Sequence, residues 1–477
     1  MTTEESPSAA TPESRYSITN NISYMYQVYC SYMMVFKNPD PSKEFMPPTL
    51  LKESLKNLTR NFYKPVSGWF ETVGDEIDVV FSDTEFNDPP LEIQMLDTGC
   101  VELREYVRSS NEDLLVPRGP SSLITKENKR IPMFLAKASY LTTNEAMVLG
   151  VTYHHSLMDG SAFWLFMYNW ASLAKQMHAR NTDGHTDRIC ENFVLPCPPT
   201  FGFPSIAHLH EPEKQFSHSE YTLVDSSDCL RAFVAGPDPI KENILRISVE
   251  QQHSIREMAR KYGVSFTAML CAMFWHETSI LRLNARPSVG PATSLFTCAV
   301  NPRASIGVSS FLCASPVINL AEARTIGEIA SMELGQVAQL VSETITKGTA
   351  AYVSSSMDFL VKHRREECEN ERLGKEGKKI MLAYVCPLEA KCTVSSSRNF
   401  PIYQCDFGSG SPVYVRPPFL PFDGCLRVWP TPEACGTGLT NKEAVLEVYL
   451  SQPGYVDLSL SPLLGPFVSS EAPILDL

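Results

Sequence analysis

Apolar residues recur along the chain at spacings that predict both helices and strands. In residues 50–62 they recur every three or four positions, which is the stripe of an amphipathic helix. Residues 146–153 form a short apolar run that is typical of a buried strand. The segment behind Gly160, SAFWLFMYNWASLAKQM, is apolar over most of its length. It predicts a helix that packs between a sheet and other elements.

The second half of the chain repeats this alternation after a long irregular stretch. Residues 181–245 are rich in proline and short polar runs, and we expect a crossover there. Beyond it we expect a strand and two helices within 245–283, and a further helix over 326–345. Strand-like runs follow at 381–385, 413–415 and 444–450. Strands and helices therefore alternate in both halves, which favours two α/β (α+β) domains.

The domain boundaries follow from these shifts in pattern. The first residues are polar, begin acidic and lack the apolar core of a signal peptide, so we expect a disordered tail over 1–17. We expect an N-terminal domain at 18–195, a crossover at 196–240 and a C-terminal domain at 241–477.

Composition excludes several classes of function. The net charge of −13, from 41 basic and 54 acidic residues, argues against a nucleic-acid groove, and an anionic ligand needs a local basic patch. No apolar run reaches the ~20 residues that span a bilayer, so we expect a cytoplasmic protein without a membrane segment. The 14 cysteines form no CxxC pair, so we expect reduced thiols and no metal site.

The segment TYHHSLMDGSAF carries the clearest chemical signal. A predicted strand ends in His154 and His155, and Asp159 and Gly160 follow. Strand alternation sends the two imidazoles to opposite faces, so only one can point into a given pocket. A neutral imidazole at a strand end is suited to accept a proton at neutral pH. Asp159 can order the loop through an ion pair, and Gly160 permits the turn into the helix.

HHSLMDG resembles the HHxxxDG signature of the coenzyme A-dependent acyltransferases of the BAHD family. Peptide-synthetase condensation domains and chloramphenicol acetyltransferase share this type of motif. Further segments match the family in order along the chain: FYKPVSG from Phe62, VSFTAMLCAMFWHET with Trp275, AVNPR ending at Arg303, and SSSRNFPIYQCDFGSGSP from Ser395. The resemblance covers nearly the whole chain beyond the tail.

The resemblance implies a fold and a set of residue roles. The fold would be two chloramphenicol acetyltransferase-like domains, each a mixed sheet flanked by helices. His155 would be the general base, in a channel between the domains that is open at both ends. Asp159 would pair with Arg303 and hold the loop. Asp406 and Gly408 would belong to a loop that shapes the donor side, and we favour a structural role for Asp406 over a second acid/base role.

The chain departs from the family pattern at three places. The family's TSW triplet reads Ser395-Ser396-Ser397, so Ser395 keeps a hydroxyl for the oxyanion while Ser397 replaces the indole donor. The tryptophan of DFGWG is Ser409, and the family's arginine position holds Asn399, with Arg398 one place early. These changes favour a microbial, fungal branch similar to the trichothecene O-acetyltransferases over a plant phenylpropanoid enzyme.

The phosphates of coenzyme A need cations. Arg256 and Arg260 lie four residues apart on a predicted helix, with Lys261 beside them and Ser265 at the start of the next helix. These four residues are the candidates for coenzyme A binding. The alternative is a solvated helix face.

Together these features predict a monomeric enzyme of secondary metabolism without a permanently bound cofactor. It would move an acyl group from acyl-CoA to a hydroxyl or amine of a small molecule, by direct transfer in a ternary complex. No GxSxG elbow suggests a covalent intermediate. Two alternatives stay open: a condensation-type transferase that uses carrier-bound donors, and a non-catalytic binding protein on the same scaffold.

Overall fold

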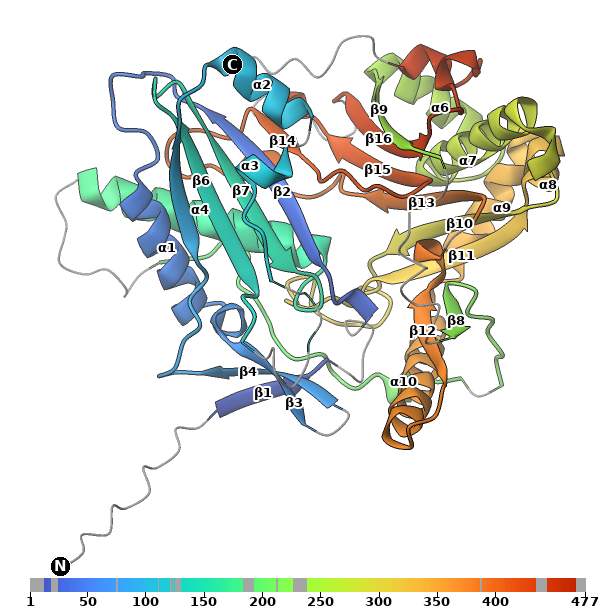
Figure 1. The fold of residues 1–477 in the computed structure, drawn as a ribbon, viewed down its shortest axis with the longest axis horizontal. Helices are drawn as coiled ribbons and strands as arrows, with labels where there is room; N and C mark the ends of the chain where they lie inside the picture. The colour runs from blue at the N-terminus through green and yellow to red at the C-terminus, as the bar shows by residue number, and fades with distance from the viewer. Residues whose placement is uncertain are drawn as a thin grey trace, which may run out of the picture.

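The computed structural model places two sheet-and-helix halves side by side (Figure 1). It describes residues 13–18, 25–73, 76–109, 111–120, 122, 124, 130–182, 193–211, 213–225, 238–386, 388–434 and 444–468. Both halves combine a mixed sheet with helices, which confirms the predicted fold class.

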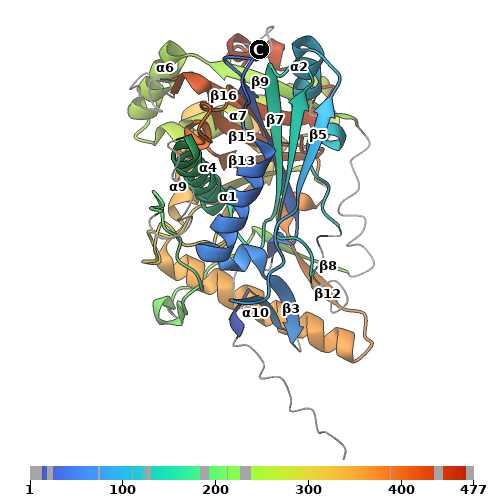
Figure 2. The same ribbon diagram turned by 90° about the vertical axis from the view of Figure 1, so that its left-hand side faces the viewer.

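The N-terminal half is built on a five-stranded sheet of order β14-β2-β7-β6-β5. Its strands are β2 (Tyr29–Lys37), β5 (Leu91–Leu96), β6 (Phe134–Leu141), β7 (Ala146–His154) and β14 (Tyr414–Arg416). Every residue of β7 is buried, because this strand lies in the middle of the sheet and both faces are covered. Helices α1 (Pro48–Asn61) and α4 (Gly160–Thr182) pack together over one face (Figure 2).

The C-terminal half contains a six-stranded sheet of order β11-β10-β13-β15-β16-β9. Its strands are β9 (Ile240–Ile247), β10 (Thr293–Val300), β11 (Ile318–Thr325), β13 (Ala390–Ser396), β15 (Cys425–Pro430) and β16 (Leu446–Pro453). The three central strands β10, β13 and β15 run parallel. The helices gathered beside this sheet are α6 (Val249–Lys261), α7 (Phe266–Ala285), α8 (Ile326–Ser331) and α9 (Leu334–Thr346).

Smaller elements complete both halves. The strands β1 (Glu13–Ser17), β3 (Trp69–Val73) and β4 (Glu76–Ser82) form a separate small sheet, and β8 (Tyr221–Asp225) pairs with β12 (Lys378–Leu382) beside α10 (Ala350–Arg372). Two short helices, α2 (Cys100–Arg108) and α3 (Glu112–Leu115), lie on the N-terminal half. Single 3-10 turns occupy Lys64–Ser67, Ala207–Leu209, Pro287–Val289, Ala383–Val385, Ile402–Gln404, Pro432–Ala434, Leu458–Leu460 and Gly465–Phe467.

The six-stranded sheet has two unlike faces. Alternate residues such as Val394, Leu426 and Val428 join the core that contains α7. The opposite residues turn toward the N-terminal half, where Trp429 stacks on Tyr32 of β2 at 5.7 Å between ring centroids. We call this second side the interdomain face.

The structure corrects three predictions on local structure. Part of the predicted tail, Glu13–Ser17, is the strand β1, which pairs with β4. The predicted crossover contains β8, a short strand that only its pairing with β12 reveals. The helix predicted over 326–345 divides at Met332, whose backbone is extended, and Glu333 begins α9 with a capping box.

The predicted domain boundary at 241 also needs a correction. β9 begins at Ile240, close to that boundary, but the later segment with DFGSG returns to the N-terminal half. There Phe407 contacts Trp170 edge-on at 5.0 Å, and β14 extends the N-terminal sheet. The first structural half is therefore discontinuous in sequence, which a linear division of the chain does not allow.

Candidate active site

His155 lies just past the end of β7, on the side of the N-terminal half that meets the C-terminal half. Its backbone N–H donates to the carbonyl of Val28 at 2.8 Å, which continues the β2–β7 pairing by one residue. Its ring stacks on Tyr26 at 4.7 Å and on Tyr153 at 5.9 Å. The residue is half-buried, and these aromatic neighbours orient its imidazole.

His154 has the opposite environment, as strand alternation predicts. It is fully buried, and its Nε2 lies 2.8 Å from the carbonyl oxygen of Ser122. Burial lowers the pKa of His154 to about 4, although this hydrogen bond acts in the other direction. His154 is therefore a neutral core residue.

Ser315, from the C-terminal half, fixes the ring of His155. Its hydroxyl lies 3.0 Å from Nδ1 of His155, and the backbone carbonyl of His155 also hydrogen-bonds to the ring. With the proton on Nδ1, the lone pair of Nε2 is left to accept a proton. Burial lowers the pKa of His155 and the Asp159 carboxylate only partly opposes this, so the ring is neutral near pH 7. Ser315 could not be identified from the sequence, because no motif marks it.

Asp159 pairs with Arg303 as the resemblance implied. The two Nη atoms of Arg303 reach the two carboxylate oxygens at 2.7 and 3.0 Å, and both side chains are buried. Arg303 also donates to the carbonyls of Leu312 and Ala314, and Asp159 caps α4 by accepting from the backbone of Ala162. The pair thus ties the loop after His155 to the segment that carries Ser315.

Gly160 is needed for space rather than for an unusual backbone. A Cβ at this position would lie 3.2 Å from the ring of Phe400, and φ is not in the left-handed region. The prediction that Gly160 supplies conformational freedom for the turn is therefore wrong. The close approach of Phe400 depends on the fold, which is why sequence alone could not identify it.

Asp406 orders its own loop. One carboxylate oxygen accepts from the backbone N–H groups of Gly408 and Gly410 at 2.8 and 2.9 Å, and the other accepts from Lys175 of α4 at 2.6 Å. Burial raises the pKa of Asp406, but these hydrogen bonds outweigh it and the net pKa is lowered. Gly408 has φ of +103°, which favours glycine. A carboxylate held by three donors agrees with the structural role that we expect for Asp406.

The serines that replace TSW differ in exposure. Ser395, near the end of β13, is exposed, whereas Ser397 is buried. The backbone N–H of Ser397 donates to the carbonyl of Val428 at 2.9 Å. Ser395 and Arg427 are register partners on β13 and β15, so both point to the interdomain face.

Arg256 lies in a cationic cluster that also contains Arg398. Both guanidinium groups lie over the ring of Phe266, at 5.0 and 5.1 Å, and both approach Oε1 of Gln252, at 3.3 and 3.5 Å. Burial lowers the pKa of Arg398, and the charge of Arg256 adds to this effect. In the sequence, Arg398 stands one place before the family's arginine position, and nothing there indicates that it lies near Arg256. Their proximity results from packing between α6 and the loop after β13.

The other candidates for coenzyme A binding lie nearby with different contacts. Arg260 is exposed, and Nζ of Lys261 lies 5.2 Å from the ring centre of Tyr262. Ser265 caps α7 by accepting from the backbone of Ala268. Only Arg256 is brought together with a second arginine.

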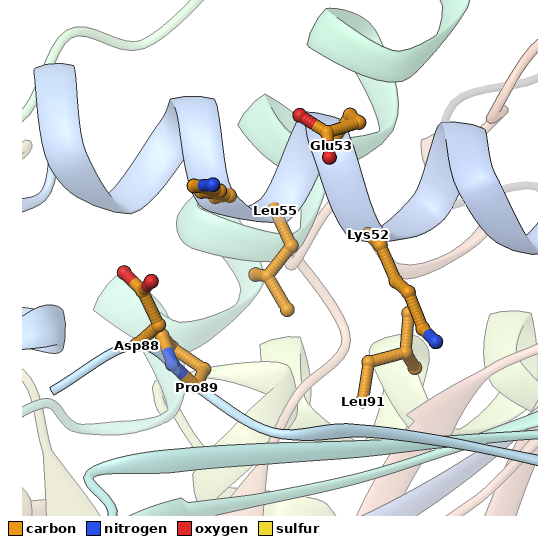
Figure 3. A pocket seen from close by; sticks show the side chains of 7 residues that line it. Lys52, Glu53, Leu55, Asp88, Pro89 and Leu91 are labelled. Atoms are coloured by element: carbon orange, nitrogen blue, oxygen red, sulfur yellow. The ribbon is translucent and has the colours of Figure 1, made fainter.

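Within the described ranges no cluster of His, Cys, Asp and Glu has the geometry of a metal site, and no helix is long and apolar enough to cross a bilayer. Burial raises the pKa of thiols such as Cys313, to about 12. A surface pocket beside α1 (Figure 3) contains no predicted site residue. It is lined by Lys52, Glu53, Leu55, Lys56, Asp88, Pro89 and Leu91.

The two sheet-and-helix halves have the chloramphenicol acetyltransferase-like fold of the solved two-domain acyltransferases TRI101 and vinorine synthase. The model of the Transferase family matches residues 5–441, and the chain belongs to this BAHD acyltransferase family. Relatives include rosmarinate synthase of Plectranthus scutellarioides, 25% identical over 90% of this chain and 92% of that protein. A hydroxycinnamoyltransferase of Narcissus pseudonarcissus is 21% identical over 91% and 93%.

Solved structures share the fold across nearly the whole chain. TRI101 of F. graminearum with ethyl coenzyme A superposes with a TM-score of 0.71 at 16% identity, covering 96% of this chain and 99% of that one. Vinorine synthase gives 0.60 at 13% identity, covering 98% and 96%. The chain is therefore an acyl-CoA-dependent O- or N-acyltransferase, and acyl-CoA is its co-substrate.

Proposed function

We propose that His155 is the general base of a direct acyl transfer from acyl-CoA to a small alcohol or amine. The observation that carries this proposal is a partly exposed, neutral imidazole with its Nδ1 held by Ser315 of the other half. A base must reach the substrate and be unprotonated at the working pH, and the partial exposure and lowered pKa of His155 support both conditions. His154 is fully buried and points to the other face of the strand, so it cannot reach a substrate.

The proposed reaction needs no covalent enzyme intermediate. The acceptor O–H or N–H gives its proton to Nε2 of His155 while its oxygen or nitrogen attacks the thioester carbonyl. The tetrahedral intermediate then collapses, and the imidazolium returns the proton to the departing thiolate. A positioned base contributes roughly 10²–10⁴-fold. Alignment of both substrates can contribute up to about 7–11 kcal/mol.

Ser395 is our candidate for the oxyanion contact. Its side chain is exposed on the interdomain face, whereas Ser397 is buried, so only Ser395 is accessible to a substrate. One such donor is worth about 10²–10³-fold in comparable sites. Asp159 and Arg303 act in this scheme as positioning residues, and Asp406 orders the donor loop.

We place the phosphates of coenzyme A at Arg256 and Arg398. Two neighbouring guanidinium groups repel each other, and a bound phosphate would offset this repulsion. The planar ring of Phe266 and the amide of Gln252 orient both groups. Arg260, Lys261 and Ser265 complete the donor-side surface in this proposal.

The setting of the reaction is also part of the proposal. We propose a monomeric cytoplasmic enzyme of secondary metabolism, and we retain the fungal branch as a prediction. The sequence relatives named above are plant enzymes, whereas TRI101 comes from F. graminearum, so the two kinds of likeness favour different branches.

The test of this function compares free and tethered donors. Purified enzyme should release coenzyme A from acetyl, aliphatic and hydroxycinnamoyl thioesters when alcohols and amines are supplied, and mass spectrometry should detect the acylated product. A condensation domain shares the fold with a TM-score of 0.53. Transfer only from carrier-bound acyl groups would favour that alternative, and ligand binding without any transfer would favour a binding protein.

A further inference from the structure

Two buried hydroxyl groups lie side by side on the interdomain face without partners. Thr297 of β10 and Thr393 of β13 are register partners, so their side chains are neighbours on the same face. Both residues are buried, at 0% and 8% exposure, and neither Oγ1 has a hydrogen-bond partner among the described residues. Leaving a buried hydroxyl unpaired is unfavourable, so a ligand that accepts hydrogen bonds would stabilise this pair.

Two cations flank this pair on the same face. Lys391 precedes Thr393 by two residues on β13, and Arg427 is the register partner of Ser395, two residues after it. Their exposures are 7% and 6%. We call Thr297, Thr393, Lys391 and Arg427 the cationic patch.

The carboxylates near the patch are shared between arginines. Glu242 accepts from Arg427 at 2.7 Å and also binds Arg416, and Nη1 of Arg427 donates to the carbonyl of Pro418. Only Nε of Arg427 has no partner among the described residues. Asp423, the carboxylate that acts on Lys391, is bound by Arg282 at 2.5 Å.

Lys391 itself forms no ion pair with any residue that the structure describes. Burial lowers the pKa of Lys391, and Asp423 opposes this only partly. Lys391 is thus a buried cation whose nearby carboxylate, Asp423, is shared with Arg282.

The patch connects to His155 through two short paths. The ring of Tyr26 stacks on His155, and its hydroxyl accepts a hydrogen bond from Asn319. Asn319 of β11 is the register partner of Ala299, which lies two residues after Thr297 on β10. On the other path, Tyr153 stacks on His155 and pairs with Cys30, whose thiol lies within electrostatic range of Arg427. These contacts link the strands of the patch to the aromatic neighbours of His155.

The direction of β13 assigns the patch to the acceptor side. The donor-side Arg398 follows the C-terminal end of this strand, whereas Lys391 lies near its beginning. Ser395 and Lys391 are four residues apart, or roughly 13 Å along a strand. A group bound at Lys391 therefore approaches the reacting centre from the side opposite the phosphates.

We propose that the cationic patch binds a carboxylate of the acyl acceptor, so that the enzyme acylates anionic alcohols or amines in preference to polyamines. This inference rests on the proposed function of His155. Lys391 and Arg427 would supply charge, and the two threonine hydroxyls would donate hydrogen bonds that they otherwise lack. These are specificity residues, and they take no part in proton transfer.

A binding experiment tests the patch without turnover. Calorimetry on the full chain, saturated with coenzyme A at pH 7, compares 3-phenylpropanoate with the neutral 3-phenylpropanamide. We expect the carboxylate to bind at least about tenfold more tightly. Lys391→Met should remove this preference and Thr393→Val should reduce it about threefold, whereas Lys379→Met, at the surface, should preserve it. Equal affinities, no detectable binding of either probe, or an unchanged preference in Lys391→Met would overturn the proposal.

A second measurement separates a recognition role from a structural one. Because their hydroxyls have no partner among the residues that the structure describes, Thr297→Val and Thr393→Val should keep or raise the melting temperature. The matched control Thr431→Val removes a buried hydroxyl that donates to the carbonyl of Val445 at 2.9 Å, and it should lower the melting temperature. A loss of stability in Thr393→Val equal to that of the control would contradict the recognition role.

Kinetics distinguishes failure of the inference from failure of the proposed function. The acceptor pair is 2-hydroxy-3-phenylpropanoate and its methyl ester, with agmatine as a cationic acceptor. A higher kcat/KM for the acid supports the patch. If the ester or agmatine is acylated equally well, the patch proposal fails and the acyltransferase proposal stands. If the carboxylate binds selectively but no acceptor is acylated, the patch proposal stands and the proposed role of His155 in acyl transfer fails.

Discussion

The two faces of the six-stranded sheet show how one set of strands serves both stability and chemistry. On the helix-covered face, Val394, Leu426 and Val428 are buried hydrocarbon without polar atoms to satisfy. On the interdomain face, one residue away along the same strands, Thr393 and Arg427 are also buried but leave polar atoms unpaired. Stability alone does not favour such unpaired groups, and this contrast is the basis for our proposal that the interdomain face is the functional surface.

The largest expected effect is on catalysis at the interdomain side. His155→Ala should reduce kcat by at least about 10²–10⁴-fold, because no base then takes the proton from the attacking alcohol or amine. Donor binding, measured by calorimetry with coenzyme A, should change little, and the folded state should persist. His154→Gln is the matched change on the other face of β7. It should act mainly on stability, and a near-normal rate for His155→Ala would refute the assignment.

The next effect concerns the buried ion pair between the halves. Asp159→Asn leaves the Arg303 guanidinium buried without its carboxylate, and we expect a loss of about 3–5 kcal/mol in the free energy of unfolding. Denaturant unfolding monitored by fluorescence measures it. Unchanged stability together with a shifted pH profile would show that Asp159 acts on the proton chemistry instead.

A change on the helix-covered face sharpens the contrast. Leu426→Ala should cost about 2–5 kcal/mol of stability, because it opens a cavity in a fully buried position. The kcat of the folded fraction should stay within about twofold, since the side chain points away from the substrates. A selective loss of kcat at unchanged stability would break the division between the two faces.

The smallest effect is expected at the loop that contains Asp406. Lys175 is 59% exposed in its side chain, so solvent screens its ion pair with Asp406. Lys175→Met should therefore change stability by no more than about 1 kcal/mol, while the two glycine N–H groups still hold the carboxylate. Thermal unfolding at two ionic strengths measures this. A much larger loss of stability would indicate that the Lys175–Asp406 ion pair is the main interaction that holds the loop in place.

The sequence predicted the parts of the site that lie within a continuous motif. HHSLMDG identified His155 and Asp159, and AVNPR identified Arg303, whose pairing the structure contains. Ser315 and the pairing of Arg256 with Arg398 were missed, because each joins segments that are distant in sequence. The cationic patch depends on strand register, which cannot be read from one strand at a time. Helix α10 was missed and the helix at 326–345 was not divided, since propensity alone does not fix such boundaries.

The pH dependence of kcat/KM is the most direct test of the central claim that a neutral His155 accepts the proton. Burial lowers the pKa of His155, so the base is deprotonated above a value lower than the ordinary ~6.5. We predict activity that is constant around pH 7 and falls at acidic pH with a single pKa below ~6.5. This acidic limb should be absent from the residual activity of His155→Gln. An identical acidic limb in that variant would contradict the account.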